Sequence, residues 1–322
     1  MCTAIYLNNG GVYFGRTLDY DFSYGEEVVI TPKSFPFNFK CGGRCDSHFA
    51  FIGTAKVING YPLYYDAMNE KGLYIAGLNF VGNACYAQEG KGEKEIAQYE
   101  LIPYLLSKCS SVDGVIYELA SASITGEQFI KDMPTAQLHW LIADKDRCIT
   151  VESVKDGLKI YDNPVGVLTN NPPFDYQLFS LNNYRNVTAS ERADSFGGGV
   201  KLETYSRGMG GMGLPGDWSS QSRFVRAAFA CANSTLTEGE TDGVIQFFHL
   251  LNTVAQPSGI CQVGQGQEKS IYSSCCIPET GRYYYSTYDS YGICAVEMEN
   301  EEGSQLIRYP HKAVGAVIQN KE

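Results

Sequence analysis

Short runs that alternate apolar and polar residues dominate the chain and predict a protein built mainly from β-strands. Two such runs, residues 3–7 and 12–16, are separated by Asn9-Gly10, a dipeptide typical of a tight hairpin turn. Many of the runs are rich in tyrosine, valine and isoleucine, which suit a pleated sheet surface. Further predicted strands are residues 27–31, 49–54, 63–68, 73–79, 138–143, 149–153, 158–161, 283–288, 293–298 and 306–309.

Helical periodicity is confined to a few segments. Val115, Ile116 and Leu119 recur on one stripe and predict a helix over residues 112–122. Similar patterns predict helices over residues 97–106, 222–232 and 244–254, the last preceded by Thr237 and Glu240 as a candidate capping box. Grouped strands and grouped helices favour an α+β fold of antiparallel sheets with helices on their faces. We therefore expect a single domain spanning residues 1–322.

Composition narrows the classes of function. The chain has 322 residues, of which 44% are hydrophobic and 19% charged, so it can bury a large core and is not expected to be disordered. The formal net charge of −11 argues against a nucleic-acid partner, which would need a basic face. It also argues against a membrane partner held by anionic lipid, and no apolar run approaches the ~20 residues that span a bilayer.

Eleven cysteines are many for this length, and their number is odd. Because the N-terminus has neither a cationic start nor an apolar run, we expect a cytoplasmic protein with reduced thiols. Cys41, Cys45 and His48 lie close together, but no second ligand pair completes a zinc site, so no metal and no cofactor are expected. Most other cysteines are interpreted as small buried apolar residues.

Two familiar motif types are poorly supported. Gly208 to Gly213 matches G-x-G-x-x-G as text, but Pro215 and Gly216 follow where a helix should begin, so we interpret it as a glycine-rich loop. The chain has only four histidines, and His139 and His249 lie in apolar runs, where packing roles are expected. Cysteine–histidine or serine–histidine catalysis is therefore not favoured.

Cys2 offers a different chemistry. Removal of Met1 would place a thiol and a free α-amine on one residue, and an α-amine is a weak enough base to be partly neutral near pH 7. The amine could then act as the base for its own nucleophile, as in an N-terminal nucleophile enzyme. The alternative is that Cys2 is an ordinary packing residue.

The predicted hairpin strengthens the catalytic interpretation of Cys2. It would return residues 14–19 close to Cys2, so that Arg16 favours the thiolate and Asp19 holds the α-amine. The alternative is a surface pair of Arg16 and Asp19 that contributes only about 0–1 kcal/mol to stability.

These motifs resemble the choloylglycine hydrolase family, which contains bile salt hydrolases and penicillin V acylases. The resemblance covers nearly the whole chain in the family's order. It is carried by residues 1–3, 14–19, 68–73, 76–80, 168–172, 214–217 and 222–224, with sequences MCT, FGRTLD, MNEKGL, AGLNF, LTNNP, LPGD and SRF.

The resemblance implies an αββα sandwich of two antiparallel sheets between helix layers, and amide hydrolysis by Cys2 after loss of Met1. The other matching active-site positions are Arg16, Asp19, Asn79, Asn170 and Arg223. Asn79 and Asn170 would hold the oxyanion, and Arg223 would support the surroundings of Cys2. Asn79 favours bile salts, because some penicillin V acylases carry tyrosine there. Taken alone, each asparagine could equally be a turn residue.

The resemblance also implies a substrate site and an assembly. Leu18, Tyr24 and Tyr65 match the family's apolar pocket for a conjugated bile salt. Arg207 either pairs with a taurine sulfonate or glycine carboxylate, or is a solvated loop residue. The family further implies a homotetramer. A penicillin V acylase with the same chemistry and a non-catalytic steroid-binding protein with the same fold remain alternatives.

Overall fold

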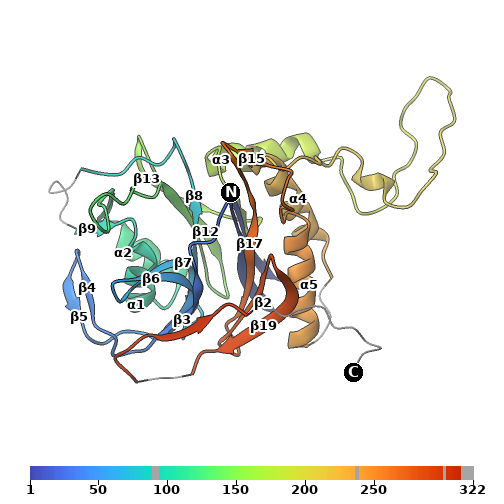
Figure 1. The fold of residues 1–322 in the computed structure, drawn as a ribbon. Coiled ribbons are helices and arrows are strands. Elements are labelled where there is room, and N and C mark those ends of the chain that lie inside the picture. Colours follow the sequence, from blue (N-terminus) through green and yellow to red (C-terminus); the bar gives the residue numbers. More distant parts are fainter. Residues whose placement is uncertain (89–93, 236–238, 300–301, 313–322) are drawn as a thin grey trace, which may run out of the picture.

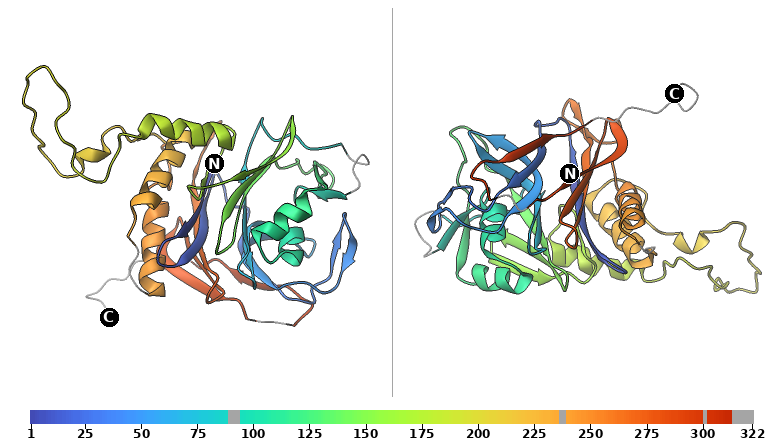
Figure 2. Two further views of the ribbon diagram at one scale, coloured as in Figure 1. Left: turned by 180° about the vertical axis from the view of Figure 1, so that it is seen from behind. Right: turned by 90° about the horizontal axis from the view of Figure 1, so that it is seen from below.

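The computed structural model describes residues 1–88, 94–235, 239–299 and 302–312. Two large antiparallel sheets pack face to face, and helices cover the outer face of each, as Figure 1 shows from left to right. Figure 2 shows the same layers from behind and from below. The predicted αββα sandwich is thus confirmed.

The first sheet has six strands and contains the N-terminal hairpin. A short strand lies at one edge, and the two hairpin strands lie next to it. Three consecutive C-terminal strands complete the sheet. The strands are, in spatial order, β14 (Val167–Leu168), β1 (Cys2–Asn8), β2 (Val12–Tyr20), β17 (Lys269–Ile277), β18 (Arg282–Thr287) and β19 (Ser290–Glu297).

The second sheet has eight strands, which in spatial order are β13 (Gly157–Asp162), β12 (Cys148–Val154), β11 (Leu138–Ala143), β8 (Tyr74–Asn79), β7 (Tyr61–Asn69), β6 (Phe51–Ile58), β3 (Glu27–Thr31) and β20 (Ile307–Pro310). Shorter strands form three pairs, namely β4 (Phe37–Phe39) with β5 (Gly43–Cys45), β9 (Lys94–Ala97) with β10 (Ala122–Thr125), and β15 (Gln262–Val263) with β16 (Gly266–Gln267).

The helices form the two outer layers. Helices α1 (Leu101–Lys108) and α2 (Val112–Leu119) lie on the side of the eight-stranded sheet, and α4 (Ser220–Asn233) and α5 (Glu240–Asn252) lie against the six-stranded sheet. Helix α3 (Phe174–Ser180) continues into the 3₁₀ turn Leu181–Tyr184, and a second 3₁₀ turn is Met209–Gly211. No helix among the described residues is long and apolar enough to cross a membrane.

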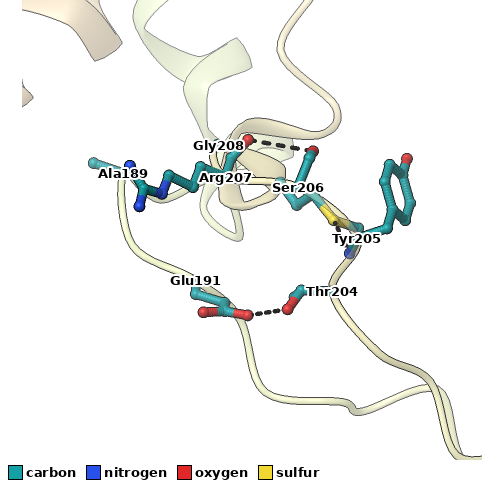
Figure 3. Close-up of a pocket in the computed structure, with 8 residues that line it drawn as sticks. Ala189, Glu191, Thr204, Tyr205, Ser206, Arg207 and Gly208 are labelled. Carbon is teal, nitrogen blue, oxygen red and sulfur yellow. Dashed lines mark hydrogen bonds between the residues drawn. The ribbon is translucent and has the colours of Figure 1, made fainter.

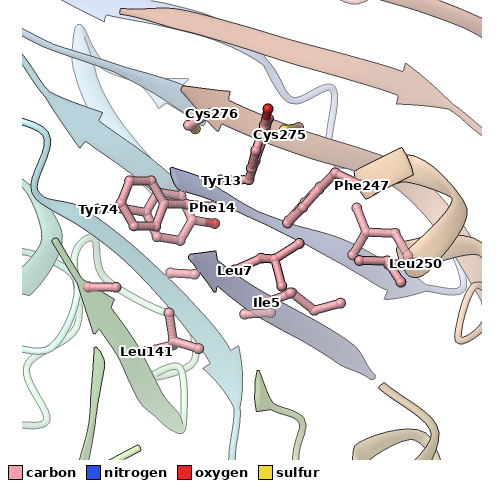
Figure 4. Close-up of a cluster of buried hydrophobic side chains, with 14 of the residues drawn as sticks. Ile5, Leu7, Tyr13, Phe14, Tyr74, Leu141, Phe247, Leu250, Cys275 and Cys276 are labelled. Atoms are coloured by element: carbon pink, nitrogen blue, oxygen red, sulfur yellow. The ribbon is translucent and has the colours of Figure 1, made fainter. Parts of the chain in front are cut away.

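Adjacent side chains of β2 point to opposite faces of the six-stranded sheet and pack against the layers on either side of it. Figure 4 shows the buried cluster to which they belong. Phe14 stacks on Tyr74 of the other sheet with ring centroids 5.2 Å apart. Its neighbour Tyr13 stacks on Phe247 of α5 at 6.2 Å. Successive side chains of a strand point to opposite faces, so one short segment packs against both the second sheet and a helix.

The structure confirms the predicted hairpin, the other predicted strands and the four predicted helices, with small shifts at their ends. The capping box is wrong in its placement, because α5 begins at Glu240 with Gly239 as its N-cap, and Thr237 lies outside the described residues. His139 is buried as expected, whereas His249 is exposed on α5. Strand β17 and helix α3 were not predicted from the sequence.

Candidate active site

The N-terminal hairpin brings together four of the candidate residues. In its register Cys2 lies opposite Leu18, with Arg16 two residues before Leu18 and Asp19 directly after it. The turn contains Gly10 at a φ of 75°, a conformation that glycine adopts readily and other residues rarely do. The Asn9-Gly10 signal therefore sets the register that places Cys2 beside these side chains.

Asn170 connects Cys2 to two other parts of the chain. The Cys2 side chain is only 4% exposed, and its backbone N–H donates to Asn170 Oδ1 at 2.9 Å. The Asn170 side-chain amide donates to the carbonyl oxygen of Asn79 at the end of β8 (2.7 Å). Its backbone N–H donates to Ser220 Oγ at the start of α4 (2.7 Å). These contacts hold the Asn170 side chain in one orientation toward Cys2.

Arg223, in the first turns of α4, is fully buried next to Cys2. Its guanidinium donates to the Cys2 carbonyl oxygen at 2.5 Å, to Thr3 Oγ1 at 2.7 Å and to Asn170 Oδ1 at 2.7 Å. It also lies 3.9 Å from Asp19 Oδ2. Burial lowers the pKa of Arg223 below its ordinary value, although the negative charges of Asp19 and Cys2 act in the opposite direction.

Arg16 is the second buried arginine of the site. Its guanidinium donates to the carbonyl oxygens of Tyr65 (3.0 Å), Thr17 (3.3 Å) and Gly77. Its Nη2 is buried and has no hydrogen-bond partner among the described residues. Burial opposes the charge, but neighbouring negative groups, Cys2 first among them, raise the pKa of Arg16 above its ordinary value. Arg16 thus remains a cation and has N–H groups to offer.

Asp19 uses both its side chain and its backbone. Its carboxylate accepts from Ser270 Oγ at 2.6 Å and from Thr17 Oγ1 at 3.2 Å. Its backbone N–H donates to the Met1 carbonyl oxygen at 2.8 Å, and its own carbonyl oxygen accepts from the Met1 ammonium at 2.6 Å. The same ammonium forms a 2.9 Å ion pair with Glu268 Oε1.

The predicted pocket residues lie at the open end of β2 and on β7. Leu18 is buried opposite Cys2, and the Tyr65 backbone contacts Arg16. Tyr24 is 41% exposed and packs with Tyr20 and Phe22, with ring centroids 5.2 and 4.7 Å away. The structure therefore brings an aromatic cluster to the end of the strand that carries Arg16.

Arg207 lies apart from this group. It belongs to a long loop that projects from the body of the molecule, beyond α4 and away from the N-terminus (Figures 1 and 2). Within the loop Arg207 lines an open pocket near Glu191 and Thr204, whose side chains are hydrogen-bonded (Figure 3). The pocket is lined by Ala189, Glu191, Thr204, Tyr205, Ser206, Arg207, Gly208 and Met209. Arg207 is thus not placed beside Cys2 within one chain.

The segment with Cys41, Cys45 and His48 uses its polar atoms locally. The ring nitrogens of His48 lie 2.7 Å from the Phe49 carbonyl oxygen and 2.9 Å from that of Phe35. No group of three or more His, Cys, Asp or Glu side chains suited to a metal ion is found in the part of the chain that the structure describes.

Sequence reasoning missed residues that support the site from a distance. His139 lies between Glu152 Oε1 (2.9 Å) and the carbonyl oxygen of Thr169 (2.8 Å), the residue before Asn170. Glu268 was also missed, because its partner Met1 is 267 residues away along the chain. Such contacts leave no local signal in the sequence.

Comparison with known proteins identifies the group to which this arrangement belongs. Residues 2–305 match the model of the linear amide C–N hydrolases of the choloylglycine hydrolase family. The chain is 52% identical over 313 residues to a bile salt hydrolase/transferase of Lactiplantibacillus plantarum, covering 96% of this chain and 97% of that protein. The chain belongs to the choloylglycine hydrolase family. It is therefore an amide hydrolase, and the family predicted from the sequence motifs is confirmed.

Solved structures agree with this membership. A conjugated bile acid hydrolase from Clostridium perfringens superposes on this choloylglycine hydrolase with a TM-score of 0.90 at 32% identity, covering 99% of this chain and all of that chain. A penicillin V acylase from Agrobacterium tumefaciens gives a TM-score of 0.75 at 21% identity, covering 97% and 92% of the two chains. The sandwich of two sheets is thus the N-terminal nucleophile hydrolase fold.

Proposed function

We propose that this choloylglycine hydrolase cleaves the amide bond of glycine- or taurine-conjugated bile salts, with Cys2 as the nucleophile after removal of Met1. The observation that carries the proposal is the buried group of Arg16, Arg223 and Asn170 around Cys2. Relatives that match nearly the full length of the chain are named bile salt hydrolases/transferases, including those of L. plantarum and C. perfringens.

The first step is acylation of Cys2. The Cys2 thiolate attacks the amide carbonyl carbon, and the buried cations Arg16 and Arg223 lie close enough to interact with its negative charge. The α-ammonium of the processed Cys2 protonates the leaving nitrogen, and Asn170 Oδ1, which accepts from the Cys2 nitrogen, orients that group. The C–N bond breaks, glycine or taurine leaves, and a thioester remains.

Stabilisation of the oxyanion is assigned to the side chain of Asn170 together with Asn79. The Asn170 backbone N–H is donated to Ser220 Oγ, so its side-chain Nδ2 is the group with a hydrogen to spare after the contact to Asn79. One such donor contributes about 3–4 kcal/mol to transition-state stabilisation. Water, activated by the α-amine, then hydrolyses the thioester and releases the free bile acid.

Substrate affinity is assigned to burial of the steroid. Leu18, Tyr24 and Tyr65 form the proposed pocket, and the exposed rings of Tyr24 and Phe22 offer apolar surface at its mouth. Each Å² of apolar area removed from water contributes about 25 cal/mol. Apolar burial explains how a chain with a net charge of −11 binds an anionic amphiphile.

We further propose that the enzyme acts as a homotetramer in the cytoplasm. The projecting loop exposes large apolar side chains, including Phe196 (77%) and Tyr205 (81%), which an interface between subunits would cover. Contact of this loop with a neighbouring subunit would also give Arg207 a place near a substrate's acidic end. All eleven cysteines are free thiols in the structure, which suits a reducing compartment. Sedimentation of wild-type enzyme and of the double variant F196S/Y205S tests the assembly, since only the variant should dissociate.

Product analysis with glycocholate, taurocholate and penicillin V tests the substrate class. We expect free cholate from both bile salts at rates well above the hydrolysis of penicillin V. Cys2→Ala should abolish the reaction, whereas Cys85→Ala, at an exposed cysteine, should leave it unchanged. Preferred hydrolysis of penicillin V would instead identify an acylase, and steroid binding without any hydrolysis would identify a non-catalytic protein.

A further inference from the structure

Two polar side chains, His139 and Glu152, point into the core between the two sheets. Trp140 of β11 lies opposite Val151 of β12, so the adjacent His139 and Glu152 face each other on the other side of the same sheet. Leu141 packs into the core between the sheets from that side. Both polar side chains are fully buried, with His139 Nδ1 2.9 Å from Glu152 Oε1. Burial of polar groups costs free energy unless they find partners, so the contacts of this pair indicate its role.

The hydrogens of this pair follow from its partners. His139 Nε2 lies 2.8 Å from the Thr169 carbonyl oxygen, which can only accept, so Nε2 carries a hydrogen. One further proton lies between His139 Nδ1 and Glu152 Oε1, because two lone pairs 2.9 Å apart would repel each other. The pair therefore has no net charge, whichever of the two atoms carries that proton. It can stay buried while it donates a hydrogen bond to Thr169.

The pair contacts both ends of the segment that contains Asn170. His139 donates to the carbonyl oxygen of Thr169, the residue directly before Asn170. Glu152 Oε1 also accepts from the backbone N–H of Phe174 at 3.1 Å, where α3 begins. The two contacts hold the first and last residues of segment 169–174, with Asn170 between them.

The same imidazole ring lies against the neighbour of Asn79. Leu138 of β11 is opposite Asn79 of β8, which brings the next residue of each strand together. The ring of Phe80, directly after Asn79, stacks on His139 with centroids 4.2 Å and planes 9° apart. Phe80 is fully buried, so its ring cannot move without disturbing the core. His139 thus contacts a residue adjacent to each of the asparagines Asn79 and Asn170.

We propose that His139 is a positioning residue that sets the placement of Asn170 relative to Asn79, and that Glu152 orients its ring. This inference rests on the proposed function, in which the two asparagines hold the oxyanion. The negative charge on that oxygen develops only as the transition state forms, so a misplaced donor raises the barrier without weakening substrate binding. Loss of the His139 contact to Thr169 should therefore lower kcat and kcat/KM equally and leave KM nearly unchanged.

Two amide substitutions at His139 separate positioning from stability. The amide nitrogen of glutamine reaches the place of Nε2, whereas that of asparagine reaches only the place of Nδ1. His139→Asn should lose the Thr169 contact and lower kcat for taurocholate about 10–100-fold, with KM within about threefold of wild type. His139→Gln gives up the hydrogen bond to Glu152 but keeps the Thr169 contact, so its kcat should stay within about threefold of wild type.

Asp144→Ala is the matched control for lost stability. Asp144 is buried at the far end of the same β11–β12 hairpin, where its carboxylate accepts from the Val112 backbone N–H at 2.7 Å. Urea denaturation should show that this variant is less stable than wild type, while its kcat is unchanged. A fall in kcat as large as that of His139→Asn would mean that activity follows stability alone, and would overturn the proposal.

A second measurement needs no turnover. Hydrogen–deuterium exchange of a peptide that spans residues 167–176 should become faster in His139→Asn but not in Asp144→Ala. Unchanged exchange or unchanged kcat in His139→Asn, or an equal fall in kcat in both His139 variants, would contradict the positioning role.

Two outcomes need a different comparison. If His139→Asn does not fold, Glu152→Ala takes its place, because it frees both the His139 ring and the Phe174 N–H, and its kcat should fall about tenfold. Full activity of Glu152→Ala would then overturn the proposal. If wild type hydrolyses no conjugated bile salt, the proposed function fails, while the exchange measurement still decides whether His139 holds the segment.

Discussion

Cys2 is surrounded by buried charges that balance one another. Arg223 contacts the Cys2 carbonyl and lies 3.9 Å from the Asp19 carboxylate. The negative charge of Cys2 in turn stabilises the buried Arg16 cation. Removing one partner of such a buried group leaves an uncompensated charge, which costs about 3–5 kcal/mol. These buried charges therefore stabilise the fold around Cys2, and the proposed function assigns them a role in the reactivity of its thiol as well.

A substitution at Asn170 tests the proposed role of this residue in the reaction. Asn170→Ala removes the acceptor of the Cys2 nitrogen and the proposed oxyanion donor, so we expect kcat/KM to fall by about 10²–10³-fold. Steady-state hydrolysis of taurocholate measures the loss. Asn171→Ala is the matched control, since Asn171 is exposed and its side chain donates to the Val81 carbonyl oxygen at 2.7 Å. Equal activity of Asn170→Ala and wild type would exclude Asn170 from the reaction.

Among the elements, β17 joins the N-terminal hairpin to the rest of the six-stranded sheet. A Cβ on Gly15 of β2 would lie 1.9 Å from the Ser274 carbonyl oxygen, so glycine allows the two strands to approach closely. On the inner face of β17, Tyr272 and Ser274 donate to the buried carboxylate of Asp66 on β7 at 2.7 and 3.0 Å. These hydrogen bonds connect one sheet to the other.

Asp66→Asn tests this link between the sheets. The Asp66 carboxylate also accepts from Tyr283 at 3.0 Å and from Tyr74 at 3.3 Å. Burial raises the pKa of Asp66, although Arg16 and the hydrogen bonds from Tyr272, Tyr283 and Ser274 oppose the shift. Replacing the carboxylate with an amide removes one hydrogen-bond acceptor oxygen and the negative charge that stabilises the Arg16 cation. We therefore expect the free energy of unfolding to fall by about 3 kcal/mol. Urea denaturation measures it, and Asp156→Asn in an exposed turn is the control. Equal stability of both variants would contradict the link.

The same elements show what the sequence can predict. The Asn9-Gly10 turn and alternation in residues 3–7 and 12–16 predicted the hairpin that places Arg16 and Asp19 beside Cys2. Strand β17 was missed because its serines and adjacent Cys275 and Cys276 show no clean alternation, although all but its first residue are buried. Its buried Tyr272 and Ser274 donate to Asp66, and its buried Ser270 donates to Asp19. These are contacts between distant segments that no local pattern reveals.

The same limit applies to the rest of the site. Asn79, Asn170 and Arg223 were identified through the family resemblance rather than through spacing, because they lie on different elements. The contacts that hold them, from Ser220 and from His139 through Thr169, exist only in the folded chain. Glu268 was missed for the same reason.

Helix α1 contains a carboxyl group that makes the stability of the protein depend on pH. Its N-cap, Glu100, is 3% exposed, and burial raises the pKa of this carboxyl to about 7 from its ordinary 4.5. Between these values the folded protein retains a proton that the unfolded chain releases. The free energy of unfolding therefore falls as the pH rises through this window, by about 3 kcal/mol at most.

Glu100→Gln has no proton to release and should remove this loss. Relative to wild type, the variant should gain stability as the pH rises from 5 to 8, as followed by urea midpoints. Its side-chain oxygen can still accept from the Lys40 backbone N–H, which lies 3.1 Å from the carboxylate. Glu203→Gln, in an exposed part of the projecting loop, should leave the pH dependence unchanged. Parallel curves for Glu100→Gln and wild type would refute the assignment.

For the whole molecule, the two-sheet sandwich places the N-terminus at one end of the space between the sheets (Figure 1). Residues from positions 2 to 268 meet there, so the site depends on the complete fold rather than on one local segment. The chain is acidic, yet its charges near Cys2 include two buried arginines. The surroundings of the thiol therefore contain buried cations that the net charge of the molecule does not indicate.

The central claim is that a processed Cys2 carries the acyl group during turnover. Acid quenching of the active enzyme during taurocholate hydrolysis, followed by mass spectrometry of its N-terminal peptide, tests the claim directly. The account predicts a peptide that begins with Cys2 and bears the mass of one cholyl group as a thioester. A fully active enzyme whose peptide begins with Met1, or an acyl group on another residue, would contradict it.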